Sequence, residues 1–137
     1  MKLSCGIVII NSYGCVLGCK PHGKTHPFYD IPKGEIDNDE NPYKCAIRET
    51  YEETGLDLSS VELIDCGVFD YMSNKRLHLF KCIFDIENFN ILTCTSKYYN
   101  QTKKEYFPEV NSYRLINCNE IDVYFYPKLS PILKMII

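Results

Sequence analysis

A strongly marked helix, predicted over residues 42–54, constrains the fold of this chain more than any other feature of its sequence. Asn41 is a favourable N-cap, Pro42 stands at the first helical position, and Gly55 supplies a C-terminal stop. The segments on either side are rich in β-branched or alternating apolar residues, which is typical of strands. A helix set among strands predicts an α/β fold, in which helices pack on a mixed β-sheet.

The other elements follow from periodicity and turn composition. We expect strands over residues 3–10, 15–20, 61–69, 76–85 and 109–116, a short apolar segment over 28–31, and a C-terminal helix over 130–137. The segments 21–27, 71–75 and 95–107 are polar, and we expect loops or turns there. Because the 137 residues show no repeat or linker, we expect a single domain over residues 1–137.

Composition and charge exclude several classes of protein. Apolar residues make up 45% of the chain and charged residues 24%, which fits a packed protein rather than a disordered one. The formal net charge of -3 provides no overall basic field, and this disfavours long nucleic acid as a partner. The longest apolar run is too short to cross a membrane, so we expect a cytosolic protein with no membrane partner.

Eight cysteines are scattered through apolar segments, and we expect them to be reduced thiols in a cytosolic protein. Cys15, Cys19, His22 and His26 have the residue types of zinc ligands, in the order C-x3-C-x2-H-x3-H. Their spacing matches no common zinc finger, which favours the interpretation of two strand thiols followed by a polar loop. A zinc-binding interaction module is the alternative.

The predicted helix carries three clustered glutamates, Glu49, Glu52 and Glu53. They form a patch that we expect to face solvent. This patch is separate from the buried face of the helix, which spans an arc of about 100°. That arc contains Tyr43, Ala46, Ile47, Thr50 and Thr54. Like charges at these spacings repel one another, and anions are unfavourable near a helix C-terminus. A solvated acidic surface is one interpretation, but a site for a hard divalent cation explains the arrangement better.

Together with the residues before it, the helix forms a longer motif. Gly34, Glu40, Arg48, Glu49, Glu52, Glu53, Gly55 and Leu56 fit the pattern G-x5-E-x7-R-E-x-x-E-E-x-G-hydrophobic. This segment resembles the Nudix box in every charged and glycine position, while Thr50 stands where an aliphatic residue is usual. The resemblance implies a Nudix α/β/α sandwich with a mixed β-sheet. It also implies a pyrophosphohydrolase that uses Mg²⁺ or Mn²⁺ to cleave phosphoanhydride bonds.

The resemblance also implies roles for single residues. Glu49, Glu52 and Glu53 would ligate the metal together with the backbone carbonyl of Gly34, and Glu49 is our first choice for the base. Arg48 would orient these glutamates. Glu40 would pair with Arg48, and Gly55 would end the helix. Some family members use an acid from a later segment, for which Glu109 is the best candidate and Glu105 the second.

The motif does not specify the substrate, but two neighbouring features narrow the class of substrates. Residues 29–34 resemble the proline-lysine-glycine segment of Nudix diadenosine polyphosphate and RNA 5′-end hydrolases. Lys33 stands beside Gly34, where we expect it to contact a phosphate oxygen, and an exposed loop lysine is the alternative. Residues 67–80 resemble the Nudix hydrolases of T4-type bacteriophages, which act on adenosine dinucleotides and ADP-ribose, and Tyr71 is suited to stack on an adenine. A phage protein of this kind would act in the host cytoplasm.

We therefore expect a small-molecule substrate in which a nucleoside diphosphate is linked to another moiety. Examples are a diadenosine polyphosphate, ADP-ribose, NADH and FAD, each of which would release a nucleoside monophosphate. The alternatives are an RNA 5′-pyrophosphohydrolase, a nucleoside triphosphate pyrophosphatase, or a nucleotide-sensing module without catalysis. The oligomeric state is left open, a homodimer included.

Overall fold

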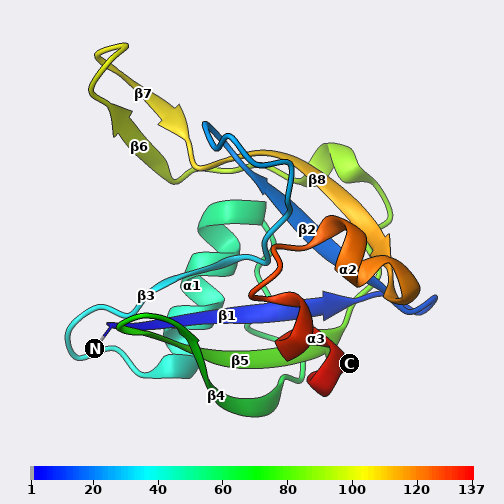
Figure 1. The fold of residues 1–137 in the computed structure, drawn as a ribbon. Coiled ribbons are helices and arrows are strands. Elements are labelled where there is room, and N and C mark those ends of the chain that lie inside the picture. Colours follow the sequence, from blue (N-terminus) through cyan, green and yellow to red (C-terminus); the bar gives the residue numbers. More distant parts are fainter. Residues whose placement is uncertain (1) are drawn as a thin grey trace.

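The computed structural model describes residues 2–137, which form a mixed six-stranded sheet with helices on both faces (Figure 1). The strands of this sheet are β1 (Lys2–Ile10), β2 (Cys15–Pro21), β3 (Lys33–Glu35), β4 (Ile64–Met72), β5 (Lys75–Ile83) and β8 (Val110–Asn117). Their order is β4-β5-β1-β2-β8, and β3 pairs with β1. The β1–β5 pair is parallel and the other pairs are antiparallel, which confirms the mixed sheet.

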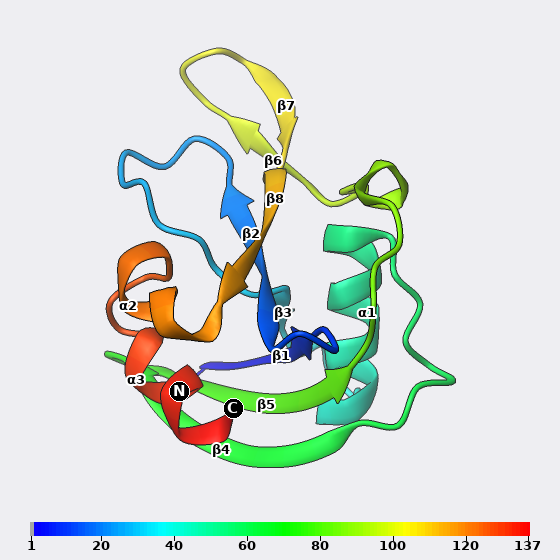
Figure 2. The same cartoon turned by 90° about the vertical axis from the view of Figure 1, so that its right-hand side faces the viewer.

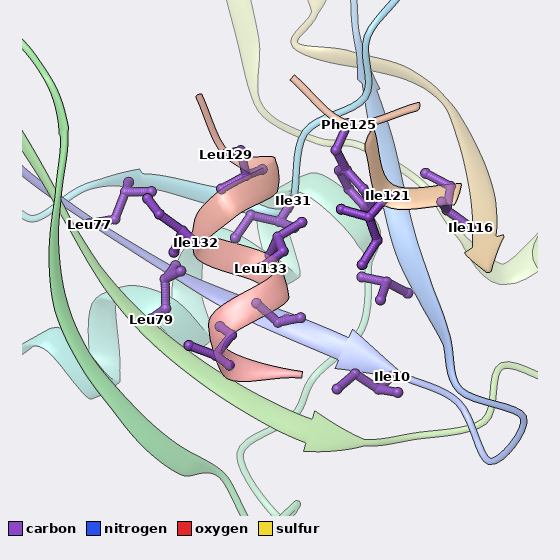
Figure 3. Close-up of a cluster of buried hydrophobic side chains, with 13 residues drawn as sticks. Ile10, Ile31, Leu77, Leu79, Ile116, Ile121, Phe125, Leu129, Ile132 and Leu133 are labelled. Atoms are coloured by element: carbon purple, nitrogen blue, oxygen red, sulfur yellow. The ribbon is translucent and has the colours of Figure 1, made fainter. Parts of the chain in front are cut away.

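The helices complete an α/β/α sandwich. Helix α1 (Pro42–Thr54) covers one face of the sheet, and α2 (Ile121–Tyr124) and α3 (Ser130–Ile136) lie over the other (Figure 2). Two short 3-10 helices, η1 (Phe89–Ile91) and η2 (Cys118–Glu120), stand in the connections. Strand β1 is buried on both faces, since Val8 belongs to the apolar cluster under α3 and Ile7 to the cluster under α1. Figure 3 shows the first cluster.

Both predicted caps of α1 are confirmed. The side chain of Asn41 accepts a hydrogen bond from the Lys44 amide at 2.8 Å. Gly55 adopts a left-handed conformation with φ 78°, and its N–H donates to the Tyr51 carbonyl. The C′ position of a helix often requires this conformation, which glycine adopts without strain.

The predicted burial of α1 was partly wrong. Tyr43 is 40% exposed, because it lies in the first turn and only touches the edge of Phe80. Glu53, which we expected to face solvent, is only 7% exposed. The reason is that the last turn of α1 lies beneath β3, where the Lys33 amide donates to the Glu53 carboxylate at 3.3 Å. The buried residues of α1 are Cys45, Ala46, Thr50, Glu53 and Thr54.

Other differences concern boundaries and one segment. β4 begins three residues later than expected and runs to Met72, so the turn before β5 is shorter. The predicted loop 95–107 was wrong, because β6 (Lys97–Asn100) and β7 (Glu105–Pro108) form a two-stranded hairpin. This hairpin projects away from the body of the molecule (Figure 1).

All eight cysteines are free thiols. Across residues 2–137, none of the helices is both long and apolar enough to cross a membrane.

Candidate active site

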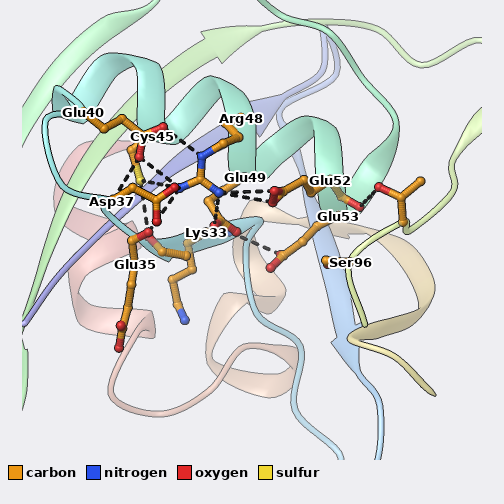
Figure 4. Close-up of polar contacts among 12 residues, drawn as sticks. Lys33, Glu35, Asp37, Glu40, Cys45, Arg48, Glu49, Glu52, Glu53 and Ser96 are labelled. Atoms are coloured by element: carbon orange, nitrogen blue, oxygen red, sulfur yellow. Dashed lines mark hydrogen bonds and ion pairs between the residues drawn. The ribbon is translucent and has the colours of Figure 1, made fainter. Parts of the chain in front are cut away.

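Arg48 is the centre of a polar network on the outer side of α1 (Figure 4). Its guanidinium donates two hydrogen bonds to Glu40, at 2.8 Å from Nε and 2.9 Å from Nη2. Nη1 donates to Glu49 at 2.8 Å and to Glu52 at 3.2 Å. The hydrogen bond from Arg48 lowers the pKa of Glu40 to about 2. The arrangement ties the loop before α1 to the helix and fixes two of the clustered glutamates.

Glu53 points inward from the same helix, toward β3. Burial, followed by the nearby charges of Asp30 and Glu49, raises the pKa of Glu53 to about 9. Glu49 is less affected, and burial together with the charge of Glu52 raises its pKa to about 6. For both carboxyl groups, burial and the neighbouring acids outweigh the adjacent cation, which is Arg48 at Glu49 and Lys33 at Glu53.

Gly34 lies directly against Glu49. A Cβ atom added at Gly34 would overlap the Glu49 carboxylate, so any other residue here would require that carboxylate to move. The Gly34 carbonyl accepts a hydrogen bond from the Cys45 thiol at 3.5 Å.

Lys33 is held by an ion pair with Asp30, in which the Nζ–Oδ2 distance is 3.0 Å. Burial alone would lower the pKa of Lys33, but the charge of Asp30 keeps it above its ordinary value, so the side chain stays cationic. Its Nζ also lies 5.6 Å from the centroid of the Tyr71 ring. Burial raises the pKa of Tyr71 to about 12, so its hydroxyl stays protonated.

A cleft of about 830 Å³ opens beside the last turn of α1 and β3. Its size is within the range of small-molecule sites, which is roughly 300–1,000 Å³. Lys33, Gly34, Glu53, Tyr71 and Glu109 all contribute to its lining. Further aromatic side chains complete its walls, among them Tyr29, Tyr98 and Tyr126.

The two candidates for an additional acid differ in position. Glu109 connects β7 to β8 and faces α1, and burial together with the charge of Glu52 raises its pKa. Glu105 lies at the other end of β7, opposite Asn100, and is exposed. Glu109, although exposed, lines the cleft together with Glu53, whereas Glu105 does not line it.

The residue types fit a hard divalent cation, which prefers carboxylate and carbonyl oxygens. As the side chains stand, no three His, Cys, Asp or Glu residues within 2–137 converge closely enough to hold one ion. Glu49 and Glu52 turn toward Arg48 instead. The close approach of Gly34 to Glu49 and the raised pKa values of Glu49 and Glu53 indicate where positive charge would be accommodated.

The four candidate zinc ligands do not converge. Cys15 begins β2 opposite Asn117, and Cys19 is buried further along the same strand. His22 stacks on Phe107, whereas His26 packs against Tyr126. The structure therefore agrees with strand thiols followed by a polar loop.

Sequence reasoning missed three residues that contact the site. Asp30 pairs with Lys33, the Tyr113 hydroxyl donates to the Glu53 carbonyl at 2.6 Å, and Cys45 donates to Gly34. Only Asp30 had a local signal, since an acid stands three residues before Lys33. Tyr113 comes from β8 and could not be found from spacing along the chain.

The sequence of the chain is similar to those of known proteins. The family model described as NUDIX domain matches residues 2–133. An uncharacterized 17.7 kDa protein in the e-segB intergenic region of Enterobacteria phage T4 is 34% identical over 122 residues, covering 83% of this chain and 81% of that protein. An RNA pyrophosphohydrolase of Vibrio cholerae is 40% identical over 63 residues, covering 46% of this chain and 36% of that protein.

Solved structures show the same fold at low sequence identity. A MutT protein from Methanosarcina mazei has a TM-score of 0.73 at 14% identity, covering 98% of this chain and 91% of that chain. A C. elegans Ap4A hydrolase has a TM-score of 0.70 at 18% identity, covering 98% and 93%. This likeness confirms the α/β/α sandwich.

Proposed function

The chain belongs to the Nudix family of pyrophosphohydrolases, and on this premise we propose that it hydrolyses a phosphoanhydride bond in a nucleotide derivative with the help of a divalent cation. The observation that carries the proposal is the placement of Glu49 against Gly34 and of Glu53 against the Lys33 amide, beside a cleft. Lys33 and Tyr71 line the same cleft, so cationic and aromatic contacts are available beside the acids.

The cation would be held by Glu49, Glu52 and Glu53 with the Gly34 carbonyl, and Glu109 would join them. Bound Mg²⁺ or Mn²⁺ would neutralise charge on the phosphate oxygens and lower the pKa of water. Arg48 holds Glu49 and Glu52 in place, because its Nη1 donates a hydrogen bond to each of them. Glu49 is the proposed base, since its pKa of about 6 lies close to neutral pH, where proton acceptance is most effective.

Lys33 and Tyr71 would bind the substrate. The Lys33 ammonium has three donors, and the ion pair with Asp30 both keeps it charged and fixes its position. The remaining donors are suited to a phosphate oxygen. Tyr71 lines the cleft beside this ammonium, so a nucleobase stacked on its ring would place the attached phosphates near Lys33.

The proposed substrates are nucleoside diphosphates linked to another moiety, such as diadenosine polyphosphates, ADP-ribose, NADH and FAD. Removal of pyrophosphate from RNA 5′ ends is the second candidate. Relatives named RNA pyrophosphohydrolase support it, as does the β6–β7 hairpin, which carries lysines and aromatic residues. A nucleotide-sensing module without catalysis is less favoured, because all three clustered glutamates are present.

Product analysis with a panel of substrates tests the proposal. Purified protein is incubated with diadenosine tri- and tetraphosphate, ADP-ribose, NADH, FAD, dGTP and 5′-triphosphorylated RNA, each with Mg²⁺, with Mn²⁺ and with EDTA. We expect release of a nucleoside monophosphate or pyrophosphate that EDTA stops. An absence of cation-dependent turnover on every member would overturn the proposed function and favour the sensing module.

A further inference from the structure

The β6–β7 hairpin pairs only with itself, outside the six-stranded sheet. Tyr98 pairs with Phe107 across the two strands, and Tyr99 pairs with Tyr106. A hairpin of two strands is marginally stable alone, so its position requires an anchor. His22 provides one, because its Nδ1 lies 2.8 Å from the Tyr98 hydroxyl and its ring stacks on Phe107 at 5.0 Å.

The second aromatic pair of the hairpin faces solvent. Tyr106 is 67% exposed and Tyr99 is 43% exposed, and their ring centroids lie 5.1 Å apart. Exposed aromatic rings on a projecting element serve no purpose in the core. They are the type of surface on which unpaired nucleobases stack, whatever their sequence.

The hairpin that carries these rings also carries positive charge. Residues 97–108 contain Lys97, Lys103 and Lys104 against the single acid Glu105, a formal charge of +2 from three minus one, in a chain of net charge -3. All three lysines are exposed. The overall negative charge of the chain thus conceals a local basic surface, and such a surface attracts phosphates at short range.

The hairpin is continuous with the candidate active site. Tyr98 and Asn100 line the same cleft as Lys33 and Glu53. A strand whose 5′ phosphates lay beside the glutamates could therefore leave the cleft along the hairpin. Tyr99 and Tyr106 alternate with Tyr98 and Phe107 along the two strands, so the exposed pair lies on the other face of the hairpin, and only a strand of several nucleotides would extend from the cleft to it.

We infer that the β6–β7 hairpin is a binding surface for single-stranded RNA, and that the substrate class of the cleft includes 5′-polyphosphorylated RNA strands. Exposed aromatic rings interleaved with lysines favour an unpaired polynucleotide over a duplex, whose bases are not free to stack. RNA binding by the hairpin does not depend on catalysis, whereas the assignment of the substrate class rests on the proposed function.

Binding is measured first, without turnover. Fluorescence anisotropy with a 5′-hydroxyl RNA of twelve nucleotides in EDTA is compared among the wild type, Lys97→Ala/Lys103→Ala/Lys104→Ala and Tyr99→Ala/Tyr106→Ala. Lys44→Ala/Lys128→Ala/Lys134→Ala removes the same charge from exposed positions elsewhere and is the matched control. Because all the substituted residues are exposed, circular dichroism should show an unchanged fold.

We expect Tyr99→Ala/Tyr106→Ala to bind RNA about tenfold or more weakly than the wild type, since each lost stacking contact alone accounts for that much. The lysine variant should also bind RNA more weakly, because it loses contacts to phosphates. In the lysine variant, the slope of log affinity against log salt should fall by about two, at about 0.7 per phosphate contact. The control should match the wild type. The inference is overturned if the wild type does not bind RNA, or if the hairpin variants bind it normally.

Turnover then tests the substrate class. With 5′-triphosphorylated RNA of one to eight nucleotides, kcat/KM should rise with length in the wild type and stay flat in the hairpin variants. Cleavage of ADP-ribose should be equal in all, because none of the five substituted residues lines the cleft. A parallel loss of ADP-ribose cleavage would overturn the inference. RNA binding without any turnover would uphold the surface and overturn the proposed function.

Discussion

At the scale of single residues, Glu40 shows how strongly Arg48 organises the site. Its pKa of about 2 lies below the ordinary value, so the unfolded chain binds more protons between about pH 4.5 and pH 2. The stability contributed by this ion pair is therefore complete above about pH 4.5 and is lost as the pH falls through that window.

Glu40→Gln should consequently destabilise the protein by roughly 1–3 kcal/mol at pH 7. The difference from the wild type should shrink as the pH approaches 2. Urea denaturation at several pH values measures this difference directly. A difference that stayed constant between pH 6 and pH 3 would show that ionisation of Glu40 does not stabilise the fold.

Thr50 leads to a prediction of the opposite sign. It is fully buried, and its hydroxyl is the one buried side-chain polar atom among residues 2–137 without a hydrogen-bond partner. An unpaired buried hydroxyl costs free energy, so Thr50→Val should raise the free energy of unfolding by about 1 kcal/mol.

Thr54→Val is the matched control for Thr50→Val. The Thr54 hydroxyl donates to the Thr50 carbonyl at 2.6 Å and accepts from the Leu56 amide at 3.1 Å. Its loss should lower the free energy of unfolding by roughly 1–3 kcal/mol. Thermal or chemical denaturation that gave both variants the same sign would contradict this interpretation of Thr50.

At the scale of elements, the contact of β3 with α1 is the most sensitive part of the site. A methyl group at Gly34 would displace the Glu49 carboxylate, and a displacement of about 1 Å can lower a rate roughly 100-fold. Gly34→Ala should therefore reduce kcat by about that factor in steady-state assays.

Gly14→Ala separates this effect from a general loss of stability. Gly14 has φ 81° and no atom near an added Cβ, so the substitution strains only the turn after β1. It should lower stability without lowering kcat. Equal losses of activity in the two glycine variants would show that the Gly34 contact has no special role.

Sequence alone predicted α1 well, because its start, end and acidic cluster are encoded locally by caps and spacing. The orientation of the helix was not encoded in this way. Glu53 is buried because β3 lies over the last turn, a contact that joins residues twenty positions apart. The hairpin over residues 97–108 was missed because its aromatic pairs bury no core and leave no clear alternation of polar and apolar residues.

At the scale of the whole molecule, the fold unites residues that are distant in the chain. Lys33 comes from β3, Tyr71 from β4, and Glu109 from the connection between β7 and β8, yet all line one cleft with Glu53 of α1. The family motif identified the acids and the fold class. It contained no information about Tyr113, whose partner is the Glu53 carbonyl sixty positions away.

The central claim is that the glutamate cluster of α1 cleaves a phosphoanhydride bond with a divalent cation. The most direct test uses the substrate of the panel that is cleaved fastest and compares the wild type with Glu53→Gln, each with Mn²⁺ and with EDTA. Because glutamine has the same shape as glutamate and its side-chain oxygen can still accept a hydrogen bond from the Lys33 amide, the fold should be retained. We predict cation-dependent turnover in the wild type, none in EDTA, and a loss of at least about 100-fold in Glu53→Gln. Turnover that persists in EDTA, or a Glu53→Gln variant as active as the wild type, would contradict the account.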